Sequence, residues 1–478
     1  MVFSSAIFIF IFLPLFIGIY YLTPSRFRSI TILIGSYIFY GWWRIDFLAL
    51  LIAVTLGNHL TAKGIVRYAG RPGGRRLMQG GVAANLLVLG VFKYFNFGVD
   101  SLNAVFESSG LNTFEALRFI LPIGISFYIF QSISFLVDVY RGDAPPARRF
   151  VDFAAFISLF PQLIAGPVLR YKDLADQFEN RTHSLDKFSE GARRFMTGFA
   201  KKVLIADTIA PLADAVFALE EPSMAEAWLG ALAYTVQLYF DFSGYSDMAI
   251  GIGLMLGFRF IENFNFPYIS RSITEFWRRW HISLSTWLRD YLYIPLGGNR
   301  KGRIRTYVNL FLTMVLGGLW HGANWTFVIW GAWHGGIMAI ERMAGIGGGT
   351  DEPGRRAQRV LQTAVTFFLV ILGWVMFRAT HVESAMAMYE GLFGFNGFAI
   401  SERMGWQITG LSLSALWIGL FIIFAGPVLH GYARQVQSGQ KAERRREVII
   451  QVGIMMLFVL AVLRLLAQSY SPFLYFQF

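Results

Sequence analysis

Two histidines have surroundings that suit chemistry. His321 lies between Trp320 and Gly322 in an apolar stretch, and His281 stands forty residues earlier, directly after an Arg-Arg-Trp sequence. Burial penalises the charged imidazolium, so a histidine in a low-dielectric setting is expected to be neutral near pH 7. A neutral imidazole can take a proton from a hydroxyl group, which makes His321 a candidate general base for acyl transfer. The alternative is a helix-packing histidine bonded to a backbone carbonyl.

The basic and aromatic sequence around His281 forms a candidate substrate-binding segment. We expect Arg278, Arg279, Asp290, Lys301 and Trp320 to bind substrate. Arginine side chains hold phosphate groups well, and a nucleotide-bearing acyl donor carries phosphates. The same charges could instead anchor the segment at the inner membrane surface. His281 could orient the donor, assist His321 or be a structural histidine of the interface, and the residues alone leave these alternatives open.

Two acidic residues and one tyrosine are further candidates. Asp241 and Asp247 fall in an apolar run, where carboxylates are usually paired, so pairing with basic residues is expected before any tuning of a histidine. Tyr475 lies in the aromatic C-terminal sequence Phe-Leu-Tyr-Phe. Such a sequence usually anchors a chain at the membrane interface, but a phenol oxygen can also carry an acyl group.

The composition places these residues in a membrane protein. The 478 residues are 55% hydrophobic, with a mean hydropathy of +0.49, and apolar runs extend from end to end. This pattern predicts an all-α, polytopic helical membrane protein. The net charge of +12 is spread in short clusters between apolar segments, which argues against nucleic-acid binding. Without cysteine, the chain cannot form disulfides, thiolate metal sites or an acyl-thioester intermediate of its own. We expect no metal and no cofactor.

Apolar segments and basic loops predict the topology. Long segments that could each cross a membrane are 2–22, 77–98, 119–140, 228–256, 360–378, 411–433 and 447–467, and shorter ones are 30–43, 45–60, 203–219, 306–320 and 325–341. Basic loops at 26–28, 63–76, 141–149, 342–359 and 434–446 alternate with loops poor in basic residues, of which 100–115 and 220–226 are acidic. The positive-inside rule then predicts about twelve crossings with both termini outside.

Three stretches do not resemble simple spans. Residues 153–169 contain Pro161, Gly166 and Pro167 and are expected to form a re-entrant or buried element. Residues 170–202 contain an amphipathic pattern typical of a helix at the inner membrane surface. Residues 257–305 are too charged to span and too aromatic for a free loop, so we expect a cytoplasmic vestibule there. The whole chain, 1–478, is interpreted as one membrane domain.

The order of six motifs resembles the membrane-bound O-acyltransferase superfamily, in the branch of the alginate O-acetyltransferase membrane subunit and the teichoic-acid D-alanyl transferase. The matching sequences are PIGISFYIFQSISFLVDVYRG (122–142), FPQLIAGPV (160–168), DFSGYSDMAIG (241–251), NFNFPY (263–268), WRRWHISLSTWLRD (277–290) and GLWHGA (318–323). The resemblance covers roughly residues 1–380, and it returns in the last eight residues.

The resemblance implies a fold with re-entrant segments around a central channel. It implies that His321 is the essential histidine, that His281 occupies the second signature position, and that Tyr475 is an acyl relay. It further implies a cytoplasmic thioester donor, acetyl-CoA or an acyl-carrier protein, and an acceptor polysaccharide outside a bacterial inner membrane. A periplasmic hydrolase-like acetyltransferase and membrane lipid are the other expected partners.

Two alternatives remain at this stage. D-alanyl transfer to teichoic acid would use a carrier protein docked at the basic vestibule. We favour acetylation because the chain's own C-terminal sequence supplies a tyrosine. A proton-coupled transporter would also use an intramembrane histidine, but it would be expected to show internal repeats, and none is apparent in the sequence.

Overall fold

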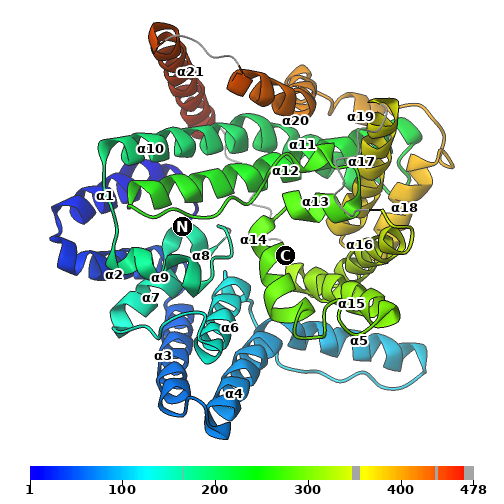
Figure 1. Cartoon of the computed structure of the whole chain (residues 1–478). Coiled ribbons are helices and arrows are strands. Elements are labelled where there is room, and N and C mark those ends of the chain that lie inside the picture. Colours follow the sequence, from blue (N-terminus) through cyan, green and yellow to red (C-terminus); the bar gives the residue numbers. More distant parts are fainter. Residues whose placement is uncertain (165, 347–355, 436–439, 468–478) are drawn as a thin grey trace. The chain divides into compact units, whose positions relative to one another are not determined.

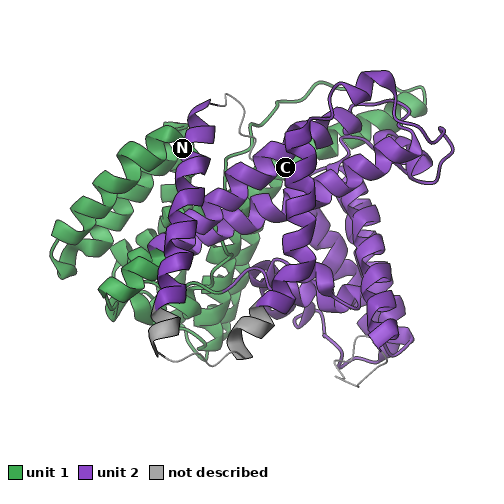
Figure 2. Ribbon diagram, turned by 90° about the horizontal axis from the view of Figure 1, so that it is seen from above, with its two compact units in different colours: residues 1–191, 252–261 green, residues 192–251, 262–478 purple. Residues whose placement is uncertain are grey.

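The computed structural model describes residues 1–478 except 165, 347–355, 436–439 and 468–478, and for 430–435 and 440–444 it describes the backbone alone. The described residues form helices joined by loops, with no strand among them, which confirms the predicted fold class (Figure 1). Contacts divide the chain into two compact units, one of residues 1–191 and 252–261 and one of residues 192–251 and 262–478 (Figure 2). The interpretation as one membrane domain stays a prediction.

The first unit is built from the N-terminal helices. They are α1 (Leu13–Leu22), α2 (Arg28–Gly41), α3 (Ile45–Arg67), α4 (Pro72–Leu89), α5 (Phe95–Ser108), α6 (Ile125–Arg141), α7 (Phe150–Ser158), α8 (Phe160–Leu163) and α9 (Tyr171–Glu179). Helices α3 and α4 are joined by their buried amides: Asn58 donates to Asn85 at 3.1 Å and Asn85 donates back at 2.7 Å. Such reciprocal bonds satisfy amide groups that would be costly to bury alone.

Two boundaries in this unit differ from the apolar pattern. The segment expected at 119–140 becomes helical only at Ile125, because Pro122 disfavours helical backbone before it and Gly124 adopts a left-handed conformation at φ +75°. A side chain on Gly124 would also overlap the Leu163 carbonyl. Helix α5 continues to Ser108, into the stretch expected to be a loop.

The stretch from 153 to 169 is a broken and buried element, as expected. Helix α7 ends at Ser158, Leu159 leaves the helical conformation, and the short helix α8 follows. Residues 153–164 are all buried. Whether the element re-enters the membrane stays a prediction.

The second unit carries the histidines. Helix α10 (Leu185–Ala200) leads into it, and it contains α11 (Asp207–Phe217), α12 (Met224–Met255), α13 (Ile273–Arg279), α14 (Ile282–Leu288), α15 (Arg303–His321), α16 (Trp325–Met343), α17 (Arg356–Arg378), α18 (Val382–Leu392), α19 (Glu402–Gly405), α20 (Gly410–Gln435) and α21 (Gln440–Ala467). Its core is rich in aromatic rings from α12, α13, α16 and α17. The segment 170–202, which was expected to form one amphipathic helix, contains two helices, α9 and α10.

Length and composition identify the helices that could cross a membrane. Within the described residues these are 45–67, 72–108, 356–378, 410–429 and 445–467. They coincide with predicted segments, although 45–67 and 72–108 are longer than expected. The chain is thus a membrane protein, while the count of about twelve crossings stays a prediction.

Candidate active site

His281 is held in an unusual backbone conformation. It joins α13 to α14 and has φ +45°, in the left-handed region that non-glycine residues rarely adopt. Its side chain is fully buried. The flanking backbone is bonded on both sides, since Trp280 N–H donates to Phe276 O at 2.8 Å and Ile282 N–H donates to Asn263 O at 3.0 Å. Strained residues of this kind persist where the surroundings fix them, which is common at functional sites.

Asn263 fixes the His281 ring. Its Oδ1 atom lies 3.2 Å from His281 Nδ1 and also accepts from the Ser283 hydroxyl at 2.8 Å. An amide oxygen can only accept, so the network assigns the proton to Nδ1 and leaves the lone pair on Nε2. Nε2 has no hydrogen-bond partner among the described residues. Burial lowers the pKa of His281 to about 3, so its imidazole is neutral and Nε2 can accept a proton or hydrogen bond.

His321 lies at the C-terminal end of α15, beside His281. The centroids of the two rings are 6.1 Å apart, and Trp320 contacts both of them. His321 is 6% exposed and lines a small cavity of about 10 Å³. The other lining residues are apolar or aromatic: Leu238, Phe242, Trp280, Trp330, Trp374 and Phe377. A volume of this size holds roughly one water-sized group.

Glycines allow α15 and α16 to cross closely enough to place His321. A side chain on Gly318 would overlap the Phe327 carbonyl oxygen, and one on Gly331 would overlap the Met314 carbonyl oxygen. Small residues at such crossings let helix backbones approach each other. The glycines at this crossing therefore serve helix packing.

A buried carboxylate positions the segment that carries His281. Glu341 on α16 is 8% exposed and accepts from the backbone N–H of Ile273 at 2.5 Å and of Thr274 at 2.9 Å. It also accepts from the Thr274 hydroxyl at 2.7 Å. These donors are the first N–H groups of α13, which have no partner inside the helix. Glu341 thereby fixes α13 against α16, the helix that packs on α15.

The predicted substrate-binding residues lie in different surroundings in the structure. Trp320 lies against the histidine rings. Arg279 is bonded to Glu275 at 2.9 Å, Asp290 is paired with Arg289 at 2.8 Å, and Arg278 and Lys301 are exposed. Their roles in binding stay predictions. Tyr475 lies outside the described residues.

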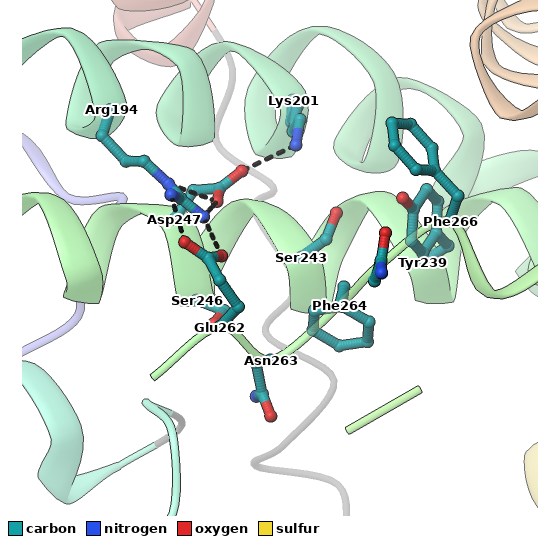
Figure 3. Close-up of a pocket in the computed structure, with 11 residues that line it drawn as sticks. Arg194, Lys201, Tyr239, Ser243, Ser246, Asp247, Glu262, Asn263, Phe264 and Phe266 are labelled. Atoms are coloured by element: carbon teal, nitrogen blue, oxygen red, sulfur yellow. Dashed lines mark hydrogen bonds and ion pairs between the residues drawn. The ribbon is translucent and has the colours of Figure 1, made fainter. Parts of the chain in front are cut away.

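A second, polar cavity of about 150 Å³ lies beside α12 (Figure 3). Asp247 accepts from Arg194 at 2.9 Å and from Lys201 at 2.6 Å, and Arg194 also pairs with Glu262. Asp241 is buried and paired with Lys202 at 2.8 Å. The expected pairing of both aspartates is thus confirmed.

Sequence reasoning missed three polar residues of this region. Ser243, Ser246 and Asn263 line the polar cavity and are each at most 3% exposed. The hydroxyls of both serines and Nδ2 of Asn263 have no partner among the described residues. The sequence feature that could have identified them is their position within two of the six motifs, 241–251 and 263–268.

His334 is a third buried imidazole. Its ring contacts Trp277 and Trp330 with centroids 5.5 and 5.0 Å away. Both of its nitrogens lack a partner within the described part of the chain. Trp330 also contacts His321, at 5.2 Å, so His334 is connected to the cavity of His321 through this indole ring.

Known proteins resemble this chain over its whole length. Residues 147–386 match the model of the membrane-bound O-acyltransferase family, and this range includes both cavities. A probable alginate O-acetylase of Pseudomonas putida is 57% identical, with both chains covered completely. A peptidoglycan O-acetyltransferase of Helicobacter pylori is 34% identical, covering 100% of this chain and 98% of the relative. A teichoic acid D-alanyltransferase of Bacillus subtilis is 28% identical over 53% of this chain and 68% of its own.

Proposed function

This chain belongs to the membrane-bound O-acyltransferase family, and we propose that it carries acetyl groups from a cytoplasmic thioester to hydroxyl groups of an exopolysaccharide outside the cell. The chain is an acyltransferase of a membrane, with an acyl donor and a polysaccharide or glycan acceptor, rather than a proton-coupled transporter. The acceptor we propose is an alginate-like polymer, since the relatives named alginate O-acetylase are more than half identical over the entire chain.

One observation carries the proposed chemistry: two buried imidazoles lie side by side, and one of them, His321, lines a small apolar cavity. His321 takes the proton from the acceptor hydroxyl, whose oxygen attacks the thioester carbonyl carbon. The C–S bond then breaks, and His321 returns the proton to the leaving thiolate, so thioester and alcohol become ester and thiol. His281, with its lone pair held in place through Asn263, assists by accepting a hydrogen bond. No metal or other cofactor is needed.

The cavity at His321 supports acetyl transfer over D-alanyl transfer. Its walls are Leu238 and aromatic rings, and it has room for about one small group. A D-alanyl ester carries an ammonium group, which is costly to bury without a partner. An acetyl methyl group has no such cost.

Sidedness and partners complete the proposal. The chain lies in a bacterial inner membrane with both termini outside, and acetyl-CoA or an acyl-carrier protein delivers the donor from the cytoplasm. Tyr475 accepts the acetyl group as an ester and passes it to a periplasmic hydrolase-like acetyltransferase or directly to the polymer. The placement of the basic loops supports this sidedness.

The function is tested with His321→Ala in a host lacking its own copy of the gene. Polymer acetylation, measured by mass spectrometry, should fall by about 10²–10⁴-fold because the general base is lost. His381→Ala is the matched control, since His381 is exposed at the start of α18, and it should acetylate normally. Tyr475→Phe should also abolish transfer if the phenol is the relay.

Membrane abundance of each variant is measured by immunoblot. Normal acetylation by His321→Ala, at normal abundance, would remove the proposed mechanism. Normal acetylation by Tyr475→Phe would remove only the relay.

A further inference from the structure

Two arginines of the first unit lie in partly buried surroundings without a carboxylate partner among the described residues. Neither Arg28 nor Arg181 forms an ion pair there, and both are only partly exposed. The carboxylate that acts electrostatically on Arg181 is Asp152, which is itself paired with Arg149 at 2.7 Å. Charges that are withdrawn from water are usually paired, so two uncompensated guanidinium groups point to an anionic ligand.

Both guanidinium groups have unused N–H donors. Arg28 donates from Nε to the Thr23 carbonyl oxygen at 3.3 Å, and its Nη1 lies 3.1 Å from His183 Nδ1. Its Nη2 makes no hydrogen bond within the described residues. Arg181 donates from Nη2 to the Ser29 hydroxyl at 3.2 Å, while its buried Nη1 has no partner in the same part of the chain. The planar fork of an arginine side chain matches two oxygens of a phosphate group.

The imidazole of His183 is neutral and is close to both arginines. The Tyr20 hydroxyl donates to the Leu256 carbonyl oxygen at 2.8 Å, so its own oxygen accepts from His183 Nε2 at 2.9 Å. Nδ1 of His183 is then the acceptor for Arg28. Burial lowers the pKa of His183, and Arg28 and Arg181 lower it further. The ring thus orients Arg28 without adding charge, and the positive charge of this arginine cluster (Arg28, Arg181 and His183) comes from its arginines.

Aromatic rings hold both arginines in place. Arg28 lies over the ring of Tyr20 at 5.2 Å, and the guanidinium of Arg181 lies over two rings, 5.3 Å from that of Phe178 and 4.8 Å from that of Phe258. Such cation–π contacts restrict the side chains before any ligand arrives, which lowers the entropy cost of binding.

The arginine cluster lies where a membrane surface is expected. Leu22, which is 86% exposed, ends the apolar helical stretch Phe8–Leu22, and Arg28 follows shortly after it. Phe27 and Leu185, which are close to the cluster in the sequence, are also exposed. Exposed apolar side chains next to basic ones are typical of the boundary between the hydrocarbon core of a membrane and the lipid headgroups.

We propose that Arg28 and Arg181 bind the phosphate of an anionic phospholipid of the phosphatidylglycerol kind, whose acyl chains cover the exposed apolar side chains beside the cluster. The headgroup supplies the negative charge that the arginines lack, and its phosphate oxygens accept from their unused N–H groups. A water-soluble phosphate would leave the neighbouring apolar surface in water. The predicted cytoplasmic position of residues 26–28 assigns the lipid to the inner leaflet. This inference is independent of the proposed reaction, since no residue of the cluster lines the cavity of His321.

The test measures lipid binding to the purified full chain in a neutral detergent by native mass spectrometry. The two probes are dioleoyl phosphatidylglycerol, which is anionic, and dioleoyl phosphatidylcholine, which has the same chains and no net charge. The wild type should bind the anionic lipid about tenfold more tightly, because two arginines near a membrane surface each favour anionic lipid. The Arg28→Gln/Arg181→Gln variant should bind both lipids equally. Equal affinity of the wild type for the two lipids overturns the proposal without any variant.

Arg75→Gln/Arg76→Gln is the matched control. It removes the same charge from two exposed side chains in the first turns of α4, within another basic loop of the first unit, and it should keep the lipid preference. An equal loss in this control, or an unchanged preference in Arg28→Gln/Arg181→Gln, overturns the proposal. Arg28→Gln alone leaves Arg181 on its aromatic rings and replaces the double variant if that variant does not fold. The single change should reduce the preference about threefold, and no reduction also overturns the proposal.

Two soluble competitors separate a lipid from other sources of phosphate. Glycerophosphoglycerol is the same headgroup without acyl chains, and adenosine bisphosphate is the nucleotide portion of coenzyme A. Neither should displace phosphatidylglycerol from the wild type when it is added in the same amount as the lipid. Displacement by the deacylated headgroup would mean that the arginines take a free phosphate. Displacement by the nucleotide would assign them to the acyl donor. Either result overturns the assignment to a lipid.

Discussion

His281 and His321 are fixed by different kinds of neighbours. Asn263 holds His281 through a hydrogen bond that sets its tautomer, whereas His321 packs against the rings of Trp320, Trp330 and Phe377 at centroid distances of 5.0–5.3 Å. Since burial lowers the pKa of His281 to about 3, this residue keeps the same charge across the physiological pH range. The pair therefore joins an imidazole of fixed orientation to one that lines the small apolar cavity.

Leu238 is expected to limit the size of the acyl group. It is 3% exposed and lines the cavity of His321. Because one methylene that does not fit a pocket can cost 10-fold or more in rate, the wild type should discriminate strongly against propionyl donors. Leu238→Ala should reduce that discrimination about tenfold, measured as the ratio of kcat/KM for acetyl and propionyl thioesters.

Leu212→Ala supplies the control for this prediction. Leu212 on α11 is 1% exposed in the same core but does not line the cavity. The truncation should destabilise the protein in a similar way, since both changes leave a cavity, and keep the acyl preference. Equal preferences in the two variants would show that Leu238 does not set acyl size.

Single residues also show which contacts could be predicted from the sequence and which could not. Carboxylates in an apolar run must be paired, so the pairing of Asp247 could be predicted. Its partners could not, because Arg194 and Lys201 come from an earlier helix and only the fold brings them to α12. Asn263 was missed for the same reason: an asparagine in a loop has no periodic signal, and its role depends on a histidine 18 residues away.

At the scale of helices, the apolar pattern predicted that a helix exists better than it predicted where the helix begins and ends. The ends of helices α12, α15 and α16 lie within four residues of the ends of the expected segments. The predicted start of the segment 119–140 was wrong because Pro122 and Gly124 delay the start of α6 to Ile125, although the sequence before it is still apolar. The short helices α13 and α14, which carry His281 between them, are too short to be predicted from apolar periodicity. The buried Glu341 that fixes α13 lies 68 residues away in the sequence.

The crossing of α15 and α16 should tolerate no side chain at its contact point. Gly331→Ala places a Cβ against the Met314 carbonyl oxygen, so the helices must separate and His321 at the end of α15 must move. We expect a lower melting temperature, from about 1–3 kcal/mol of strain, and reduced transfer activity. Thermal denaturation and acetylation assays measure the two effects.

Gly336 on the same helix is the matched control. Nothing lies within 4 Å of a Cβ built there, so Gly336→Ala should leave activity unchanged and slightly strengthen the helix. Normal stability and activity of Gly331→Ala would mean that the two helices are not packed as closely as the glycines indicate.

For the whole molecule, the loops rich in basic residues are expected on the cytoplasmic side of the membrane and the acidic loops on the other side. The residues from 63 to 76 include five basic side chains, while the segment from 100 to 115 is acidic, with Asp100 paired to Arg118 at 2.6 Å. Between them runs one continuous apolar helical stretch, 72–108, long enough to cross a membrane. A single crossing would leave the turn before α4 in the cytoplasm and the loop after α5 outside.

The lack of cysteine makes this arrangement directly measurable, because one introduced thiol is then the only thiol in the chain. Ala69 and Ser109 are both exposed and lie just outside the two ends of that stretch. In intact spheroplasts a membrane-impermeant maleimide should label Ser109→Cys and spare Ala69→Cys, and after permeabilisation it should label both. The wild type, without a thiol, gives the background. Since the stretch 72–108 separates the two positions, equal labelling in intact spheroplasts would show that this stretch does not cross the membrane, and the reverse pattern would place the basic loops outside. The reverse pattern would put the donor and the acceptor on sides that the proposed reaction cannot use.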